Sequence, residues 1–173
     1  MASELRILIE VVHPAHVHFF RVPMERLIEQ GHEVLVASRD KDVTLSLLDD
    51  AGVDHRCLST AGHGLMRLAI ELVRRDVALW RLARSFRPDV MCGYGGVAIS
   101  HVGKVLGIRT LGFYDTEKAV LQQRLTLPFI DKQYVPLCYD GLTASGRTDR
   151  FQGPKELSNL HVDNLVADRN IAI

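Results

Sequence analysis

LRILIEVV, residues 5–12, is an apolar run rich in β-branched side chains and free of glycine and proline. Such a run is typical of a strand that is buried on both faces of a parallel sheet. It stops at His13-Pro14, because the residue before a proline is pushed out of the helical region. From His16 apolar residues recur at helical spacing until Gly31, where a helix is expected to end, and Pro23 predicts a kink or the true start of that helix.

The same alternation continues along the chain. Further strands are expected at 33–37, 54–58, 89–92, 108–114 and 132–136, and helices at 43–51, 65–86, 98–106 and 118–125. Strands that alternate with helices pair in parallel through right-handed crossovers. The predicted fold class is therefore α/β: a Rossmann-like parallel sheet with helices on both faces.

The domain organisation follows from length and pattern. A chain of 173 residues has the size of one domain. Residues 1–137 are predicted to form this Rossmann-like domain. After Pro136 the periodicity fades and glycine, serine, threonine and aspartate become frequent, so residues 138–173 are interpreted as a linker or tail.

Composition excludes some classes of partner. Lysine plus arginine equals aspartate plus glutamate, at 21 each, so no general attraction to nucleic acid or anionic lipid is expected, and any polyanion site must be local. The run Ile7–Val12 is far shorter than the about 20 residues that a transmembrane helix needs. The first residues lack the basic region and cleavage site of a signal peptide.

Three cysteines, Cys57, Cys92 and Cys138, are widely separated and form no CxxC pair. We expect them to be buried free thiols, since an odd number cannot all pair within one chain. A reducing, cytoplasmic setting fits that expectation.

Candidate binding residues follow from one rule for open parallel sheets, in which ligands bind beyond the carboxyl ends of the strands. Polar or glycine-rich segments that follow different strands should then converge in space. The candidates are His13, His16 and His18 after the first strand, Arg39 after the second, His63 after the third, Tyr94, Gly95 and Gly96 after the fourth, and Asp115, Thr116 and Glu117 after the fifth.

The HPAHVH segment, residues 13–18, is the most unusual of these. His16 lies at a helix start, where backbone N–H groups and the helix dipole favour an anion. Histidine titrates near neutral pH, so it could act as a general acid or base, or donate a hydrogen bond to a sugar hydroxyl. The alternative is that these histidines simply cap the helix and pack. No metal site is predicted, because residues i and i+2 of a helix do not face each other and no cysteine is near.

Gly93-Tyr94-Gly95-Gly96 lets the backbone approach a ligand closely, although an ordinary tight turn would explain it as well. It does not match the GxGxxG dinucleotide fingerprint, and the first strand–helix turn has no glycine. NAD binding is therefore disfavoured, and no cofactor is predicted.

Asp115-Thr116-Glu117 places two carboxylates at a strand end, where they could orient hydroxyl groups or exchange protons. The alternative role is a helix N-cap. Arg39 could contact a phosphate or carboxylate. The arginines of the long helix are assigned to its solvent-facing side: Arg67, Arg74, Arg81 and Arg84.

Several motifs resemble a GT-B-like family that is related to UDP-N-acetylglucosamine 2-epimerases and nucleotide-sugar glycosyltransferases. The matching segments are VVHPAHVHFF (11–20), GHEVLVASRDKDVTLSLLDDAG (31–52), FRPDVMCGYGG (86–96), GFYDTE (112–117), RLTLPFIDK (124–132) and GPKELSNLH (153–161). The resemblance implies two Rossmann-like domains around a cleft, of which the first holds the acceptor and the second most of the nucleotide-sugar. This chain would be the N-terminal half, incomplete without a second domain that a separate gene could encode.

The resemblance also implies roles. His13, His16, Asp115 and Glu117 would line the cleft, with His16 or Glu117 as the catalytic proton-transfer group, and no metal would be needed. The implied function is the acceptor side of a glycosyltransferase or 2-epimerase-like protein in surface polysaccharide synthesis.

Two other classes stay open. One is a non-catalytic binding or subunit protein, which either docks on a partner through apolar residues around 125–130 or is a degenerate remnant. The other is a response-regulator-like signalling domain, which fits less well because HPAH replaces the expected acidic pocket.

Overall fold

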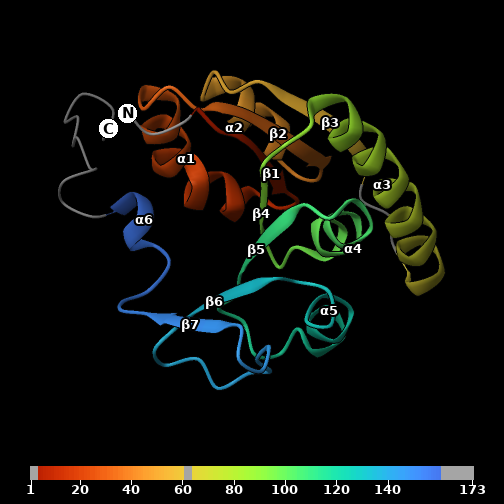
Figure 1. Cartoon of the computed structure of the whole chain (residues 1–173), viewed down its shortest axis with the longest axis vertical. Helices are drawn as coiled ribbons and strands as arrows, with labels where there is room; N and C mark the ends of the chain where they lie inside the picture. Colours follow the sequence, from red (N-terminus) through yellow and green to blue (C-terminus); the bar gives the residue numbers. More distant parts are fainter. Residues whose placement is uncertain (1–3, 61–63, 161–173) are drawn as a thin grey trace.

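The computed structural model describes residues 4–60 and 64–160. The strands are β1 (Arg6–Val11), β2 (Glu33–Asp40), β3 (His55–Thr60), β4 (Val90–Tyr94), β5 (Arg109–Phe113), β6 (Lys132–Pro136) and β7 (Thr148–Phe151). The helices are α1 (Pro14–Glu29), α2 (Thr44–Asp50), α3 (Leu65–Phe86), α4 (Val97–Leu106), α5 (Val120–Thr126) and α6 (Leu157–Leu160). Figure 1 shows how these elements are arranged.

All seven strands form one parallel sheet in the order β3-β2-β1-β4-β5-β6-β7. The chain reverses its direction of winding between β1 and β4, which is the switch point of a Rossmann-like sheet. The predicted fold class is confirmed.

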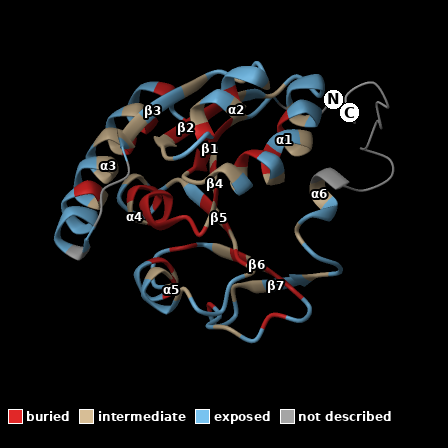
Figure 2. Ribbon diagram, turned by 180° about the vertical axis from the view of Figure 1, so that it is seen from behind, coloured by how far each residue is buried: buried red, intermediate tan, exposed pale blue. Residues whose placement is uncertain are grey.

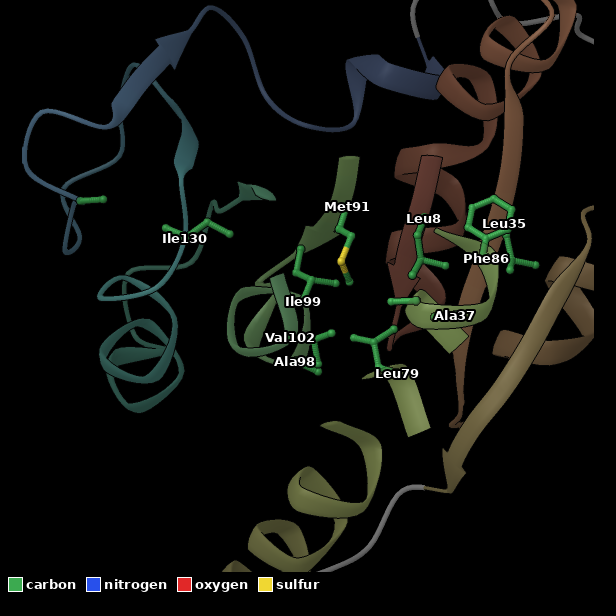
Figure 3. Packing of buried hydrophobic residues seen from close by; sticks show 12 residues of the cluster. Leu8, Leu35, Ala37, Leu79, Phe86, Met91, Ala98, Ile99, Val102 and Ile130 are labelled. Carbon is green, nitrogen blue, oxygen red and sulfur yellow. The ribbon is translucent and has the colours of Figure 1, made fainter. Parts of the chain in front are cut away.

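The helices cover both faces of the sheet. Leu8 of β1 and Met91 of β4 pack against α3 and α4 around Leu79 and Ile99, as Figure 3 shows. Ile7, Ile9 and Val11 of β1 face the other way and pack on α1 and α2. β1 is thus buried on both sides, as its uninterrupted apolar run predicted. The buried residues of these two layers are coloured red in Figure 2.

Three expectations need correction. Thr148–Phe151, within the predicted tail, form β7, which pairs only with β6 at the sheet edge and therefore needs no apolar run. Pro14 occupies the first turn of α1 and Pro23 stays inside the helix, so the helix starts well before Pro23. Cys57 and Cys138 are exposed rather than buried.

Within the described ranges, no helix combines the length and apolar character needed to cross a bilayer.

Candidate functional site

A cavity of about 470 Å³ lies at the carboxyl edge of the sheet, at the switch point between β1 and β4. Its walls come from the ends of four strands and from the helices α1, α3, α4 and α5. Seven of the predicted residues line it: His13, His16, Arg39, Tyr94, Gly95, Asp115 and Thr116. The structure therefore brings together segments that are up to about a hundred residues apart in the chain.

The other predicted residues lie elsewhere. His18 is exposed on α1, and Glu117 is exposed beyond β5; neither lines this cavity. Gly96 is buried beside the cavity as the N-cap residue of α4. His63 lies outside the described residues.

The first turn of α1 fixes both cavity histidines. His13 is its N-cap residue, and its Nδ1 accepts a hydrogen bond from the backbone N–H of Ala15 at 3.2 Å. His16 Nδ1 accepts from the backbone N–H of Val12 at 3.4 Å. In each neutral ring the hydrogen must then be on Nε2, which is left as a donor. Capping and lining of the cavity are thus compatible roles for the same side chains.

Burial and nearby positive charge keep these imidazoles neutral. Burial, then His13 and Lys155, lower the pKa of His16 to about 3. Burial, then Lys41, lower the pKa of His13. Near neutral pH, both rings offer hydrogen bonds without carrying charge.

Tyr94 lies between His16 and the acidic side of the cavity. Its ring centroid is 5.0 Å from that of His16, and Lys155 Nζ lies 5.3 Å from the Tyr94 ring centroid. Burial and the Asp115 carboxylate raise the pKa of Tyr94 above its usual range, so the hydroxyl stays protonated.

Asp115 forms an ion pair with Lys155, from the segment between β7 and α6. Burial alone would raise the pKa of Asp115, but hydrogen bonds from Lys155, Tyr94 and Thr116, together with the positive charge of Lys155, outweigh burial and lower that pKa. Asp115 is therefore a carboxylate near neutral pH. Lys155 is a site residue that was not predicted from the sequence, although the segment that contains it, residues 153–161, is one of the resembling motifs.

A buried ionic network lies on the α3 side of the cavity. Glu71 pairs with Arg39, accepts a hydrogen bond from Ser59 Oγ at 2.9 Å, and lies 3.4 Å from Arg75 Nη1. Arg75 Nε lies 3.3 Å from Oε1 of Glu10, a buried residue of the interior strand β1. The guanidinium of Arg39, predicted to contact a ligand anion, is thus already paired with Glu71.

The network was not predicted, but the sequence contains a signal for it. Glu10 interrupts an apolar strand, and Arg75 interrupts the leucine-rich side of α3. A charged residue at each such position needs an opposite charge.

The Gly95-Gly96 turn holds one wall of the cavity. Both residues have positive φ, +78° and +48°, which favours glycine. The Gly95 carbonyl accepts hydrogen bonds from the Tyr114 hydroxyl and, at 3.0 Å, from Thr126 Oγ1. The Gln122 side chain fills the space that a Cβ on Gly95 would need. α5 therefore fixes the shape of this turn.

Across the described ranges, no group of three or more histidine, cysteine, aspartate or glutamate side chains is arranged to hold a metal ion.

Comparisons with known proteins give a family and a fold. The model of a family described as "Protein of unknown function (DUF354)" matches residues 5–169. The uncharacterized protein MJ0665 of Methanocaldococcus jannaschii is 26% identical over 161 residues, which are 91% of this chain and 47% of the relative. The chain thus spans about half the length of this curated relative.

Among solved structures, MurG of Acinetobacter baumannii is 14% identical with a TM-score of 0.67, over 84% of this chain and 44% of MurG. The spinosyn forosaminyltransferase SpnP is 16% identical with a TM-score of 0.63, over 87% of this chain and 51% of SpnP. A UDP-GlcNAc 2-epimerase from Neisseria meningitidis, crystallised with UDP-GlcNAc, is 13% identical with a TM-score of 0.60, over 76% and 40% of the two chains. The resemblance to GT-B-like proteins is confirmed for the fold.

Proposed function

We propose, given that this chain belongs to the DUF354 family of proteins of unknown function, that it is the acceptor-side domain of a GT-B-type glycosyltransferase or 2-epimerase-like protein. One observation carries the proposal. The cavity at the switch point combines two neutral histidines, which donate hydrogen bonds, with a carboxylate that accepts them. This set suits a hydroxyl-rich, uncharged ring such as a sugar.

The environment of His16 favours a positioning role for this residue. A general base must offer a free lone pair, but His16 Nδ1 already accepts the Val12 N–H. A pKa of about 3 also makes the protonated ring very unfavourable. We therefore assign His16 to hold a ligand oxygen through Nε2–H.

Asp115 is the better candidate to accept a hydrogen bond from a reacting hydroxyl, and ultimately its proton. It lines the cavity as a carboxylate, whereas Glu117 is exposed outside it. The ammonium group of Lys155, which pairs with Asp115, would still balance the negative charge of this carboxylate when a ligand hydroxyl takes over one of its hydrogen bonds. Proton transfer is thus assigned to Asp115 rather than to His16 or Glu117.

Sugar transfer or epimerisation also requires a nucleotide-sugar held opposite this cavity. Positioning of the two reactants supplies much of the rate of such a reaction. Since the solved GT-B-like structures are about twice as long as the matched region, we propose that a complementary domain supplies the nucleotide-binding side. Surface polysaccharide synthesis extends this proposal on the resemblance, and a cytoplasmic location extends it on the free cysteines.

Calorimetric titration of the chain with UDP-N-acetylglucosamine, and with N-acetylglucosamine alone, tests the proposal. We expect saturable binding that Asp115→Asn weakens by about tenfold, because a charge-assisted hydrogen bond is lost. The control His18→Gln changes an exposed histidine outside the cavity and should leave the binding unchanged. Absence of heat with both ligands would contradict a sugar site.

The second candidate function is a non-catalytic docking subunit. Leu125 and Phe129 are partly exposed, which favours it, but Ile130 is fully buried, so the predicted apolar surface at 125–130 is only partly present. Mixing the chain with a separately produced complementary domain separates the two candidates. Sugar transfer that appears only in the mixture, and is lost with Asp115→Asn, supports the enzymatic role; a complex without turnover supports docking.

A further inference from the structure

The helix α3 carries an apolar stripe on its outer side. Met66, Ile70, Val73 and Val77 are 79%, 50%, 63% and 42% exposed. Their spacing of four, three and four residues places them on one side of the helix. Figure 2 shows that the first turns of α3 are exposed, at the end of the helix that projects past the sheet. We call these four residues the outer stripe.

The outer stripe is separate from the side of α3 that holds the helix on the domain. Leu79 and Ala83 are buried against the sheet and α4. Glu71 and Arg75 also face inward, to the ionic network. The outer stripe therefore adds nothing to this core, and exposure of a contiguous apolar surface indicates a binding partner.

The exposed charges of α3 all have one sign. They are Arg67, Arg74, Arg81 and Arg84. The two acidic residues of the helix have partners within the domain: Glu71 pairs with Arg39, and Asp76 Oδ2 lies 2.9 Å from His101 Nδ1. In a chain with a net charge of zero, this places local positive charge beside the outer stripe.

We propose that α3 docks the domain onto the surface of an anionic phospholipid bilayer. The outer stripe would enter the boundary between headgroups and acyl chains, and the arginines would contact lipid phosphates. Arg67, Arg74 and Arg81 recur every seven residues, so they run along one flank of the outer stripe. A planar anionic bilayer surface can contact the outer stripe and this row of arginines at the same time.

The positive charge of the arginines makes it unfavourable for a second copy of the chain to cover the outer stripe. Two outer stripes that pair antiparallel would bring one arginine row against the other. The outer stripe also lies on a helix that projects past the sheet, as Figure 1 shows, and a fluid bilayer can adapt to a projecting helix without a complementary groove.

Trp80 gives a built-in probe for this proposal. It is the only tryptophan of the chain, it follows Val77 by three residues, and it is half-buried beside Arg84. Transfer of α3 to a bilayer should shift Trp80 emission to shorter wavelength. The measurement uses vesicles of phosphatidylglycerol and phosphatidylcholine in equal parts, with pure phosphatidylcholine vesicles for comparison, and sedimentation of the vesicles as a second readout.

We expect binding to the anionic vesicles that high salt suppresses, because salt screens the arginine contacts. Ile70→Ser with Val73→Ser, and separately Arg67→Gln with Arg74→Gln and Arg81→Gln, should each weaken it by at least about tenfold. Val105→Ser on α4 and Arg109→Gln on β5 are matched controls, since both residues are exposed and neither belongs to α3, and should change binding by less than about twofold.

Three results would overturn the proposal. One is absence of an emission shift and of sedimentation with anionic vesicles. Another is equal binding by the stripe variant, the arginine variant and the controls. A third is a dimer in analytical ultracentrifugation that the stripe variant abolishes, which would identify a second copy as the occupant. The arginine variant removes no apolar contact, so its thermal unfolding should match the wild type and keep the test valid even if the stripe variant unfolds.

Discussion

Glu71→Ala is expected to lower the free energy of unfolding by about 3–5 kcal/mol, the cost of breaking a buried ion pair by removing one partner. The substitution leaves the guanidinium of Arg39 without its carboxylate and removes one of the two acids near Arg75. All three side chains are largely buried, so water cannot replace the lost partner well. Urea unfolding at neutral pH measures the difference.

The chain offers a matched control for this prediction. Arg6 and Glu33 form the same kind of pair at 2.7 Å, but both side chains are well exposed. Glu33→Ala should cost at most about 1 kcal/mol. If both substitutions cost the same, the network at the cavity contributes no more than a surface pair, and the account of it is wrong.

The pH dependence has a definite sign. Burial alone would raise the pKa of Glu71, but hydrogen bonds from Arg39 and Ser59, together with the positive charges of Arg39 and Arg75, outweigh burial and lower it. A folded pKa below the unfolded one stabilises the fold above the unfolded pKa, and this contribution is lost as the pH falls through the folded pKa. The stability difference between wild type and Glu71→Gln should therefore shrink on acidification.

Leu79→Ala is expected to cost about 2–5 kcal/mol, because Leu79 is fully buried between α3, the sheet and α4 and its truncation leaves a cavity. Val73 provides the matched control on the outer side of the same helix, since it is well exposed, and Val73→Ala should cost less than about 1 kcal/mol. Denaturant unfolding of both variants compares the two sides of α3. Equal costs would mean that α3 does not pack on the domain through the side that the structure assigns.

The elements with a strong local signal could be predicted from the sequence. The β-branched run of β1 and the 22-residue amphipathic pattern of α3 both correspond to observed elements, α3 with the predicted bounds. β7 could not be found in this way, because its four residues Thr148–Phe151 are partly exposed at a sheet edge and carry no apolar run.

The part of the site that could be predicted from the sequence is the part that follows from sheet topology. The rule that ligands bind beyond the strand ends selected His16, Tyr94 and Asp115, which the structure gathers around one cavity. The partners of these residues depend on tertiary packing. Lys155 reaches Asp115 across 40 residues of chain, which no local pattern reports.

The remaining differences between the predicted and the observed site depend on which way each side chain faces, and this depends on the tertiary structure. Asp115 and Glu117 looked equivalent in sequence, but only Asp115 lines the cavity, and the Glu117 side chain is exposed. The arginines of α3 were interpreted as a solvent-facing set. The exposure of the apolar residues beside them, from Met66 to Val77, became visible only once α3 was placed against the sheet.

The protonation state of His16, read from the ring nitrogens by long-range ¹H–¹⁵N NMR during titration with N-acetylglucosamine, tests the cavity most directly. The account predicts a neutral ring with hydrogen on Nε2 at every pH above its pKa of about 3, and a shift of the Nε2 signal when the sugar is added. A ring that is protonated near neutral pH, or hydrogen on Nδ1, or an Nε2 signal that the sugar leaves unmoved, would contradict it.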